Sequence, residues 1–470
     1  MEKYMPGQNR KDRAISLHQR QWLPEWRRDA LRTTLWIVPA LLVAIVSALF
    51  GMTYLVDRLV YDGQISLPPW INTGGADAGR QILIAIAAAV ITVAGVVFSV
   101  VIVALTLASQ QFGPRILRNF IRDRGTQFTL GIFVATFVYS VLALGSITSG
   151  SGRDFVPHIS ISVALGLLLA DLVVLIYFIH HVATSIQLNE VVASIGGDLV
   201  RAIDIEAARD RGAELSDQLL EPGPNWPGAS AAEVSATRSG YLGAVNRRDL
   251  VALAIRWDAV IRLLYRPGHF VVAGRPMALV SPPEAAPSVA SALDKAHITG
   301  RHRTLSQDML FAVDQLVEIA IRALSPAVND TFTAMTCVDW LTAGLCRVSS
   351  YTFPEREFHD GGGAVRLIEP GLSYKKVVDR AFDKIRQAGR GMPAIAIRQL
   401  DSLNRVVECA TSTGQRQVLL VQADMILRAS EEAVAEERDR QDVRASHDKL
   451  LRTVERIEET TVLTAEIVEG

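Results

Sequence analysis

The chain has 470 residues, of which 49% are hydrophobic, and its formal net charge is −1. Such a near-neutral chain has no chain-wide basic signal, so we expect no nucleic-acid partner. Its three cysteines (Cys337, Cys346 and Cys409) form no CxxC pair and have no histidine at ligand spacing. We therefore predict free thiols, and we expect neither a metal nor another cofactor.

Four long apolar segments lie in the first 180 residues, and none follows them. They are Leu35–Val56, Ile82–Leu107, Phe128–Ile147 and Ile159–Ile179. Each has about the 20 residues that an α-helix needs to cross about 30 Å of hydrocarbon. The second segment contains no charge, and a soluble helix of that kind would have to lie in the centre of a large core. We predict a four-helix transmembrane domain over residues 35–180, embedded in a lipid bilayer.

The lysines and arginines near the ends of these segments predict the orientation. They are concentrated in a basic N-terminal segment, residues 1–34, and in the loop after the second apolar segment. The positive-inside rule then places both termini in the cytoplasm, and we expect a multi-pass protein of the bacterial inner membrane. Trp22 and Trp26 lie within the basic segment. This segment is either an orientation signal with interfacial anchors or an amphipathic stretch that contacts anionic lipid.

The chain after the fourth apolar segment is predicted to form an α+β cytosolic domain. Residues 181–232 read as a connecting helix and a linker rich in proline and glycine, and residues 233–300 as a small β-rich module. Residues 301–428 show mainly helical patterns. Residues 429–470 form a charged helical tail, for which a solvated helix is favoured over a coiled coil. The expected strands are Gly240–Val245, Ala259–Leu264, His269–Val272 and Met277–Val280.

A helical hairpin is predicted inside the cytosolic domain. Apolar residues recur at helical spacing over Thr304–Leu324 and again over Thr331–Val348. The turn between the two helices contains Ser325, Pro326, Asn329 and Asp330. The proline breaks the first helix because it lacks an N–H group, and the Asn-Asp pair can cap the second helix. The alternative interpretation of that pair is a polar binding site between the two helices.

Asp171 lies near the middle of the fourth apolar segment. A carboxylate at mid-bilayer costs about 2.5–3.5 kcal/mol on insertion scales, so we expect its side chain to face protein or water. One interpretation is an ion- or proton-linked site. The other is a hydrogen bond that holds the fourth helix against Thr136, Tyr139 or Ser140 of the third.

The second apolar segment mixes small and hydroxyl residues, among them Ser99 and Thr106. Such residues can line an ion path, and they also allow helices to pack closely in lipid. Gln110 and Arg115 follow at the expected cytoplasmic mouth. Arg115 would lie at a vestibule, bind a lipid phosphate, or serve only as a positive-inside anchor.

His180 and His181 lie where the fourth apolar segment leaves the membrane. Imidazoles titrate near neutral pH, so the pair is a candidate pH sensor, with a polar interface pair as the alternative. Adjacent side chains on a helix point about 100° apart, so we do not expect the two rings to hold one ion.

Several segments resemble a family of predicted bacterial multi-pass membrane proteins that is known only as a domain of unknown function. They are Ser109–Arg115, Phe133–Tyr139, His180–Gln187, Gln307-Asp308 and Ala323–Ala334. Relative to the family pattern, Gly113 stands where serine is expected and Thr331 where proline is expected. The resemblance implies a membrane protein and no defined chemistry.

The sequence contains no GxxxxGK[ST] loop, no HExxH and no GxSxG, so we do not expect an enzyme. The leading hypothesis is a homo-oligomeric ion channel or transporter, in which the second apolar helix lines the path and the cytosolic domain gates it. The alternative is a membrane-anchored scaffold or envelope-stress sensor without transport. An enzyme that acts on a lipid would need a paired nucleophile and base, which the sequence does not offer.

Overall fold

The computed structural model describes residues 36–64, 74–112, 123–148, 154–185, 187–213, 231–305, 307–351 and 356–469. Two compact units divide the chain, Met1–Gln187 and Leu188–Gly470. The basic N-terminal segment, Arg115 and most of the expected linker lie outside the described residues.

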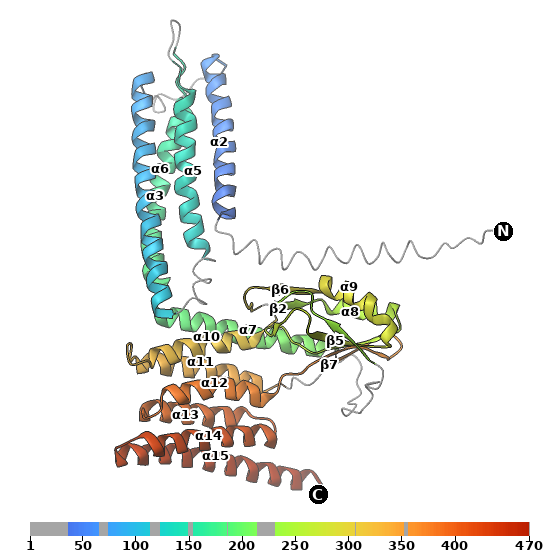
Figure 1. The fold of residues 1–470 in the computed structure, drawn as a ribbon. Helices are drawn as coiled ribbons and strands as arrows, with labels where there is room; N and C mark the ends of the chain where they lie inside the picture. Colours follow the sequence, from blue (N-terminus) through green and yellow to red (C-terminus); the bar gives the residue numbers. More distant parts are fainter. Residues whose placement is uncertain are drawn as a thin grey trace, which may run out of the picture. The chain divides into compact units, whose positions relative to one another are not determined.

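The described part of the first unit contains four helices that are long and apolar enough to cross a membrane (Figure 1). They are α2 (Ile37–Tyr61), α3 (Ala76–Phe112), α5 (Arg124–Ser146) and α6 (His158–Ser185). The four predicted spans are confirmed, although most of the helices extend further into the flanking polar sequence than the apolar segments do. Helix α5 packs against each of the other three. Gly131 of α5 allows the close approach of α2, because a Cβ atom there would lie 2.9 Å from Cα of Pro39.

Large apolar side chains cover the outside of these helices. On α6, for example, Leu169, Val173 and Ile176 are exposed by 67%, 66% and 65%. A soluble protein rarely exposes so large an apolar surface, whereas lipid is the natural neighbour of such side chains. The surface therefore supports membrane insertion independently of helix length.

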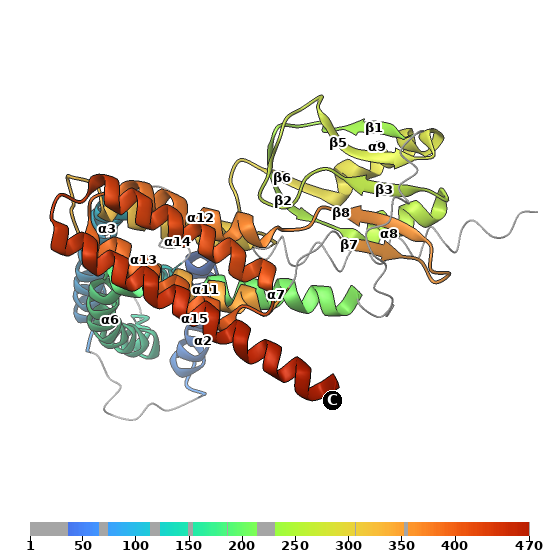
Figure 2. The same cartoon turned by 90° about the horizontal axis from the view of Figure 1, so that it is seen from below.

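Seven helices of the described second unit form a layered stack (Figures 1 and 2). They are α7 (Leu188–Ala213), α10 (Met309–Ala323), α11 (Thr331–Ser349), α12 (Tyr374–Ala388), α13 (Pro393–Cys409), α14 (Thr413–Ala433) and α15 (Glu437–Glu469). Helices α10 and α11 pack against each other and against α7, which confirms the predicted hairpin. Helices α12 and α13 cover the hairpin, and α14 packs on both.

One face of the charged C-terminal segment packs against other helices, which corrects the expectation of a fully solvated helix. Helix α14 continues to Ala433, and α15 then packs against α13 and α14. Val443, Leu450 and Val454 of α15 are buried. The many charges on the other faces of α15 dilute this apolar stripe in the sequence, so the periodicity is weak.

The second unit also contains two β-sheets (Figure 2). The five-stranded sheet has the order β1-β5-β3-β8-β7, and the three-stranded sheet has the order β4-β2-β6. The strands are β1 (Ala232–Ser235), β2 (Gly240–Val245), β3 (Val260–Leu263), β4 (Phe270–Val271), β5 (Pro276–Ser281), β6 (His297–Gly300), β7 (Arg356–His359) and β8 (Val365–Glu369). All neighbours are antiparallel except β3 and β8. The four strands expected from sequence are confirmed as β2 to β5.

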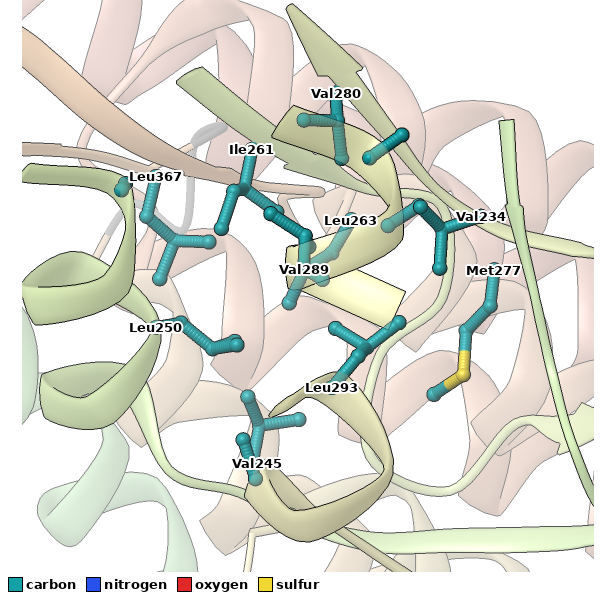
Figure 3. Close-up of a cluster of buried hydrophobic side chains, with 14 of the residues drawn as sticks. Val234, Val245, Leu250, Ile261, Leu263, Met277, Val280, Val289, Leu293 and Leu367 are labelled. Carbon is teal, nitrogen blue, oxygen red and sulfur yellow. The ribbon is translucent and has the colours of Figure 1, made fainter. Parts of the chain in front are cut away.

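The β-rich part is not confined to residues 233–300. Strands β7 and β8 join it from beyond the hairpin, and β8 pairs in parallel with β3 through Ile261 and Leu367. Helices α8 (Arg247–Arg256) and α9 (Ala286–Ala296) complete its core. Figure 3 shows this core, in which Leu250 of α8 and Val289 of α9 lie against Ile261 and Leu367 of the sheet. The region is therefore a mixed sheet with two packed helices and a helical hairpin inserted between β6 and β7, which confirms the predicted α+β class.

Helices α7 and α11 approach closely at Gly196, where a Cβ atom would lie 2.3 Å from Cε3 of Trp340. We expect Gly196→Ala to lower the free energy of unfolding by about 1–3 kcal/mol, because the ring or a helix must move. Gly197→Ala is the matched control, since the nearest atom to its Cβ would be Nη1 of Arg201 at 3.9 Å. Thermal unfolding of the purified variants measures the difference, and equal midpoints would contradict the prediction.

Candidate functional site

A buried polar cluster lies where α2 ends and α6 begins. The carboxylate of Asp57 accepts hydrogen bonds from the backbone N–H groups of Ile159 and Ser160, at 2.8 and 3.0 Å, and from Oγ of Ser160 at 2.7 Å. Oγ of Ser160 lies 3.0 Å from Oγ1 of Thr53, which lies 2.9 Å from the hydroxyl of Tyr139. All four polar side chains are at least 95% buried. Asp57 thus caps the first turn of α6 and joins α2, α5 and α6.

Asp171 lies in the middle of α6, about 16 Å from Ser160 along the helix. Oγ1 of Thr136 on α5 donates to its Oδ1 at 3.2 Å. Its other oxygen, Oδ2, is buried and has no hydrogen-bond partner among the described residues. The structure therefore places Asp171 against one of the three expected partners on α5. The unpartnered oxygen leaves a proton- or ion-linked role open to test.

A histidine–carboxylate pair lies at the other end of the same helices. Nε2 of His181 is 2.8 Å from Oδ2 of Asp123, and its ring stacks on Tyr177 with centroids 5.4 Å apart. Asp123 caps α5 by accepting from the backbone N–H of Thr126 at 2.8 Å. Gly125 makes room for the imidazole, because a Cβ atom there would lie 2.6 Å from Nε2.

The neighbours of Asp123 also determine its charge. Burial raises the pKa of this carboxyl. The hydrogen bonds from Thr126 and His181 together lower it by more, so the pKa lies below its ordinary value. Asp123 is therefore ionised at neutral pH. His180 is exposed and takes no part in this pair. The two adjacent histidines thus have different surroundings, as their position on a helix predicts.

The hydroxyl groups of α3 are satisfied within their own helix. Thr92, Ser99 and Thr106 are spaced seven residues apart, and each donates to the carbonyl four residues earlier, at 2.7, 3.0 and 2.8 Å. All three are exposed, and a Cβ at Gly95, between them, would meet nothing within 4 Å. We call these four residues the hydroxyl face of α3. Gln110 lies on the same helix, although its side chain falls outside the described residues.

The hydroxyl face lies opposite the side of α3 that packs against the other helices. Val90, Ala94 and Val97 form that packed side and are buried. On a helix with 3.6 residues per turn, these positions point roughly half a turn away from the hydroxyl face. A single copy of the chain therefore leaves the hydroxyl face uncovered by the described helices.

The turn of the helical hairpin is held by its own hydrogen bonds. Asp330 is the N-cap of α11 and accepts from the backbone N–H of Thr333 at 3.0 Å and from its hydroxyl at 2.5 Å. Oγ of Ser325, next to Pro326, donates to the carbonyl of Arg322 at 2.7 Å. Asn329 adopts a left-handed φ of +50°, a conformation that asparagine tolerates. The capping prediction is confirmed.

The three cysteines are free thiols, as predicted. Burial raises the pKa of Cys337 to about 12, so this thiol is not a nucleophile at neutral pH. Among the described residues no group of three or more His, Cys, Asp or Glu side chains could hold a metal ion.

Comparison with known proteins identifies the family of this chain. The family model described as "Predicted membrane protein (DUF2254)" matches residues 32–405. The chain belongs to this family. An uncharacterized protein of Mycobacterium bovis and another of Mycobacterium tuberculosis are each 31% identical to this DUF2254 chain over 445 residues. Each alignment covers 91% of this chain and 82% of the relative. No solved structure matches it significantly.

Two polar residues of this DUF2254 protein were missed in the sequence. Asp57 directly follows the predicted span Leu35–Val56, and the two charges of Asp57 and Arg58 end the apolar run in the sequence. Leu59, Val60 and Tyr61 continue the helix and were the available signal. Asp123 lies in an arginine-rich loop, where nothing in the spacing pairs it with His181.

Proposed function

We propose that this DUF2254 protein forms a homo-oligomeric channel or transporter for a small ion, in which the hydroxyl face of α3 lines the path between copies. The observation that carries the proposal is the exposure of this face. Lipid favours large apolar side chains, whereas small and hydroxyl residues favour a neighbouring helix or water. A second copy packed near this face would give it such a neighbour.

The packing inside one copy favours a path between copies. Phe133 and Tyr139 of α5 are fully buried and fill the centre of the four helices. A continuous aqueous path through this core would have to displace them. The outward face of α3 needs no such rearrangement.

Asp171 and the Asp123–His181 pair give the proposed transporter titratable groups at two depths. Oδ2 of Asp171 is buried without a partner among the described residues, so its protonation would change the interaction between α5 and α6. His181 is only partly buried, and its partner Asp123 is ionised at neutral pH. These groups support a proton-linked or pH-dependent flux.

The orientation completes the proposal. By the positive-inside rule, both termini and the second unit lie in the cytoplasm of the bacterium, and the membrane is the inner one. Helix α7 follows α6 in the chain after two residues, and in this proposal a change in α6 would be passed to the second unit through that connection. The second unit would then gate the path.

A second candidate function is a scaffold or stress sensor without transport. The hairpin tip supports it, because Phe332 is exposed by 78% and Val328 by 54%. Exposed apolar side chains at a rigid turn are suited to binding a protein partner. Flux measurements separate the two functions, since a scaffold predicts none.

Ser99→Phe is expected to reduce ion flux through proteoliposomes to the background of empty liposomes, because a ring on the hydroxyl face fills the path. Val100→Phe is the matched control, since Val100 is exposed by 41% on another side of α3. Potassium, sodium, chloride and proton flux are measured under voltage, osmotic tension and a pH gradient. Wild-type protein without flux in all of these conditions, or equal loss in both variants, would contradict the proposal.

A further inference from the structure

An open pocket lies in the second unit between the helical stack and the sheets. Its empty space is about 340 Å³, including the part that opens to solvent. Glu206 of α7, Arg247 of α8, Arg356 of β7 and Glu369 of β8 line it, together with Arg266 of the loop between β3 and β4. Residues far apart in the sequence thus bring three guanidinium groups and two carboxylates to one place.

The two carboxylates are already engaged by two of the arginines. Nε of Arg247 donates to both oxygens of Glu369, at 2.9 and 2.8 Å. Nη1 of Arg356 lies 3.0 Å from Oε1 of Glu206. The side chains of both pairs are at least 83% buried. Within each pair the two charges cancel, so the five lining residues together carry a formal net charge of +1.

Arg266 has a donor atom that none of these pairs engages. Its Nη1 is buried and has no hydrogen-bond partner among the described residues. Burial lowers its pKa; the carboxylates of Glu206, Asp308 and Glu369 raise it, and the nearby Arg356 lowers it. Arginine nevertheless stays protonated in proteins, so the group cannot avoid the cost by losing its charge. A buried donor without an acceptor is costly, and an anion in the pocket would remove that cost.

The backbone around Arg266 is fixed in place. Its N–H donates to Nδ1 of His269 at 3.3 Å, and its carbonyl accepts from the N–H of His269 at 3.1 Å. Gly268 has a φ of +93°, and a Cβ atom there would lie 2.2 Å from Oδ2 of Asp308. Asp308 is held in turn by Nε of Arg303 at 2.8 Å. The guanidinium is thus presented by a preorganised loop, as a binding site requires.

We propose that this pocket binds the anionic oxygen group of a small ligand, a phosphate or a carboxylate, through Arg266. The planar guanidinium matches both groups in geometry and charge. The bound group would be a free solute or the headgroup of an anionic lipid, which share this chemistry. The inference goes beyond the proposed transport function and does not depend on it.

The test uses the full chain in detergent, titrated with inorganic phosphate and, separately, with succinate at constant ionic strength. Wild-type protein is expected to give saturable binding by calorimetry, and Arg266→Gln to bind about tenfold more weakly or worse. Arg301→Gln, at an exposed arginine of the same unit, is expected to bind like wild type. Equal loss in the two variants, or no saturable binding to wild type, would overturn the proposal.

Two further measurements are needed. The first tests whether Arg266→Gln has a folding defect, and the second tests whether the bound group belongs to a lipid or to a free solute. Without ligand, Arg266→Gln is expected to unfold at the wild-type temperature or above, because it removes a half-buried charge whose Nη1 has no acceptor among the described residues. Nanodiscs of phosphatidylcholine with and without phosphatidic acid form the lipid arm. Competition of phosphatidic acid with phosphate in the wild type, and not in Arg266→Gln, would identify a headgroup. Phosphate binding that is the same in both nanodiscs identifies a free solute.

Discussion

Replacing Asp57 with alanine is expected to lower the free energy of unfolding of the four-helix unit by about 2–5 kcal/mol. The carboxylate is 3% exposed, and its removal leaves two backbone N–H groups and the hydroxyl of Ser160 without their acceptor. The site is buried, so each lost hydrogen bond carries part of its desolvation cost. The first turn of α6 and its contact with α2 weaken together.

Asp62→Ala is the control for Asp57→Ala, since Asp62 follows the same helix and is exposed. Thermal unfolding in detergent, followed by circular dichroism, compares the two variants with wild type. Asp57→Asn should fall between wild type and Asp57→Ala, because the amide keeps one acceptor oxygen but turns its NH₂ group toward other donors. If Asp57→Ala unfolds at the same temperature as Asp62→Ala, the cluster does not stabilise the unit.

The stability of the second unit is expected to fall by about 3 kcal/mol between pH 6.5 and pH 4 because of His297 alone. This imidazole is buried, and Nδ1 donates to the carbonyl of Leu293 at 2.8 Å. Its Nε2 is buried without a partner among the described residues. Burial lowers the pKa of His297 to about 4. The folded protein therefore holds the ring neutral.

The direction of this pH dependence follows from the number of protons that the folded and unfolded chains bind. Between pH 6.5 and pH 4 the unfolded chain binds a proton at this histidine and the folded chain does not, so acid favours unfolding. The contribution of His297 to the free energy of unfolding has its full value above pH 6.5. It is lost as the pH falls to about 4 and does not change below that. Carboxylates elsewhere add their own pH dependence, which a variant at position 297 leaves unchanged.

His297→Phe isolates this effect because it keeps a ring and removes the titratable nitrogen. The difference in unfolding free energy between wild type and His297→Phe is expected to change by about 3 kcal/mol from pH 7 to pH 4, measured with a chemical denaturant. The corresponding difference for His302→Phe, at an exposed histidine, should stay constant. A constant difference for His297→Phe as well would show that the ring accepts a proton in the folded state.

Elements with strong local signals could be predicted from the sequence. The four spans follow from apolar length, and the hairpin follows from its two periodic helices around Pro326. Asp330 caps α11 because a side chain that precedes a helix can reach its first N–H groups without help from the rest of the fold. Strands β2 to β5 were also visible, because their turns lie close together in the chain.

Elements that depend on distant partners could not be predicted. Strands β7 and β8 are short and follow two long helices, and only the pairing of β8 with β3 identifies them as part of the sheet. Asp57 reaches residues more than a hundred positions away in α6, and no local pattern reports that contact. Arg266 is likewise a polar loop residue in the sequence, and its unpaired state emerges only when the pocket is assembled.

The parallel pairing of β3 with β8 also constrains the order in which the protein can be built. Strand β3 would remain an edge of its sheet until the ribosome has released residues 356–369, by which time the helical hairpin has already emerged. Open edges template aggregation, so this interval is a point of vulnerability during synthesis. A fragment that ends at residue 300 would stay in that state permanently. The smallest soluble piece worth expressing must therefore extend past Glu369.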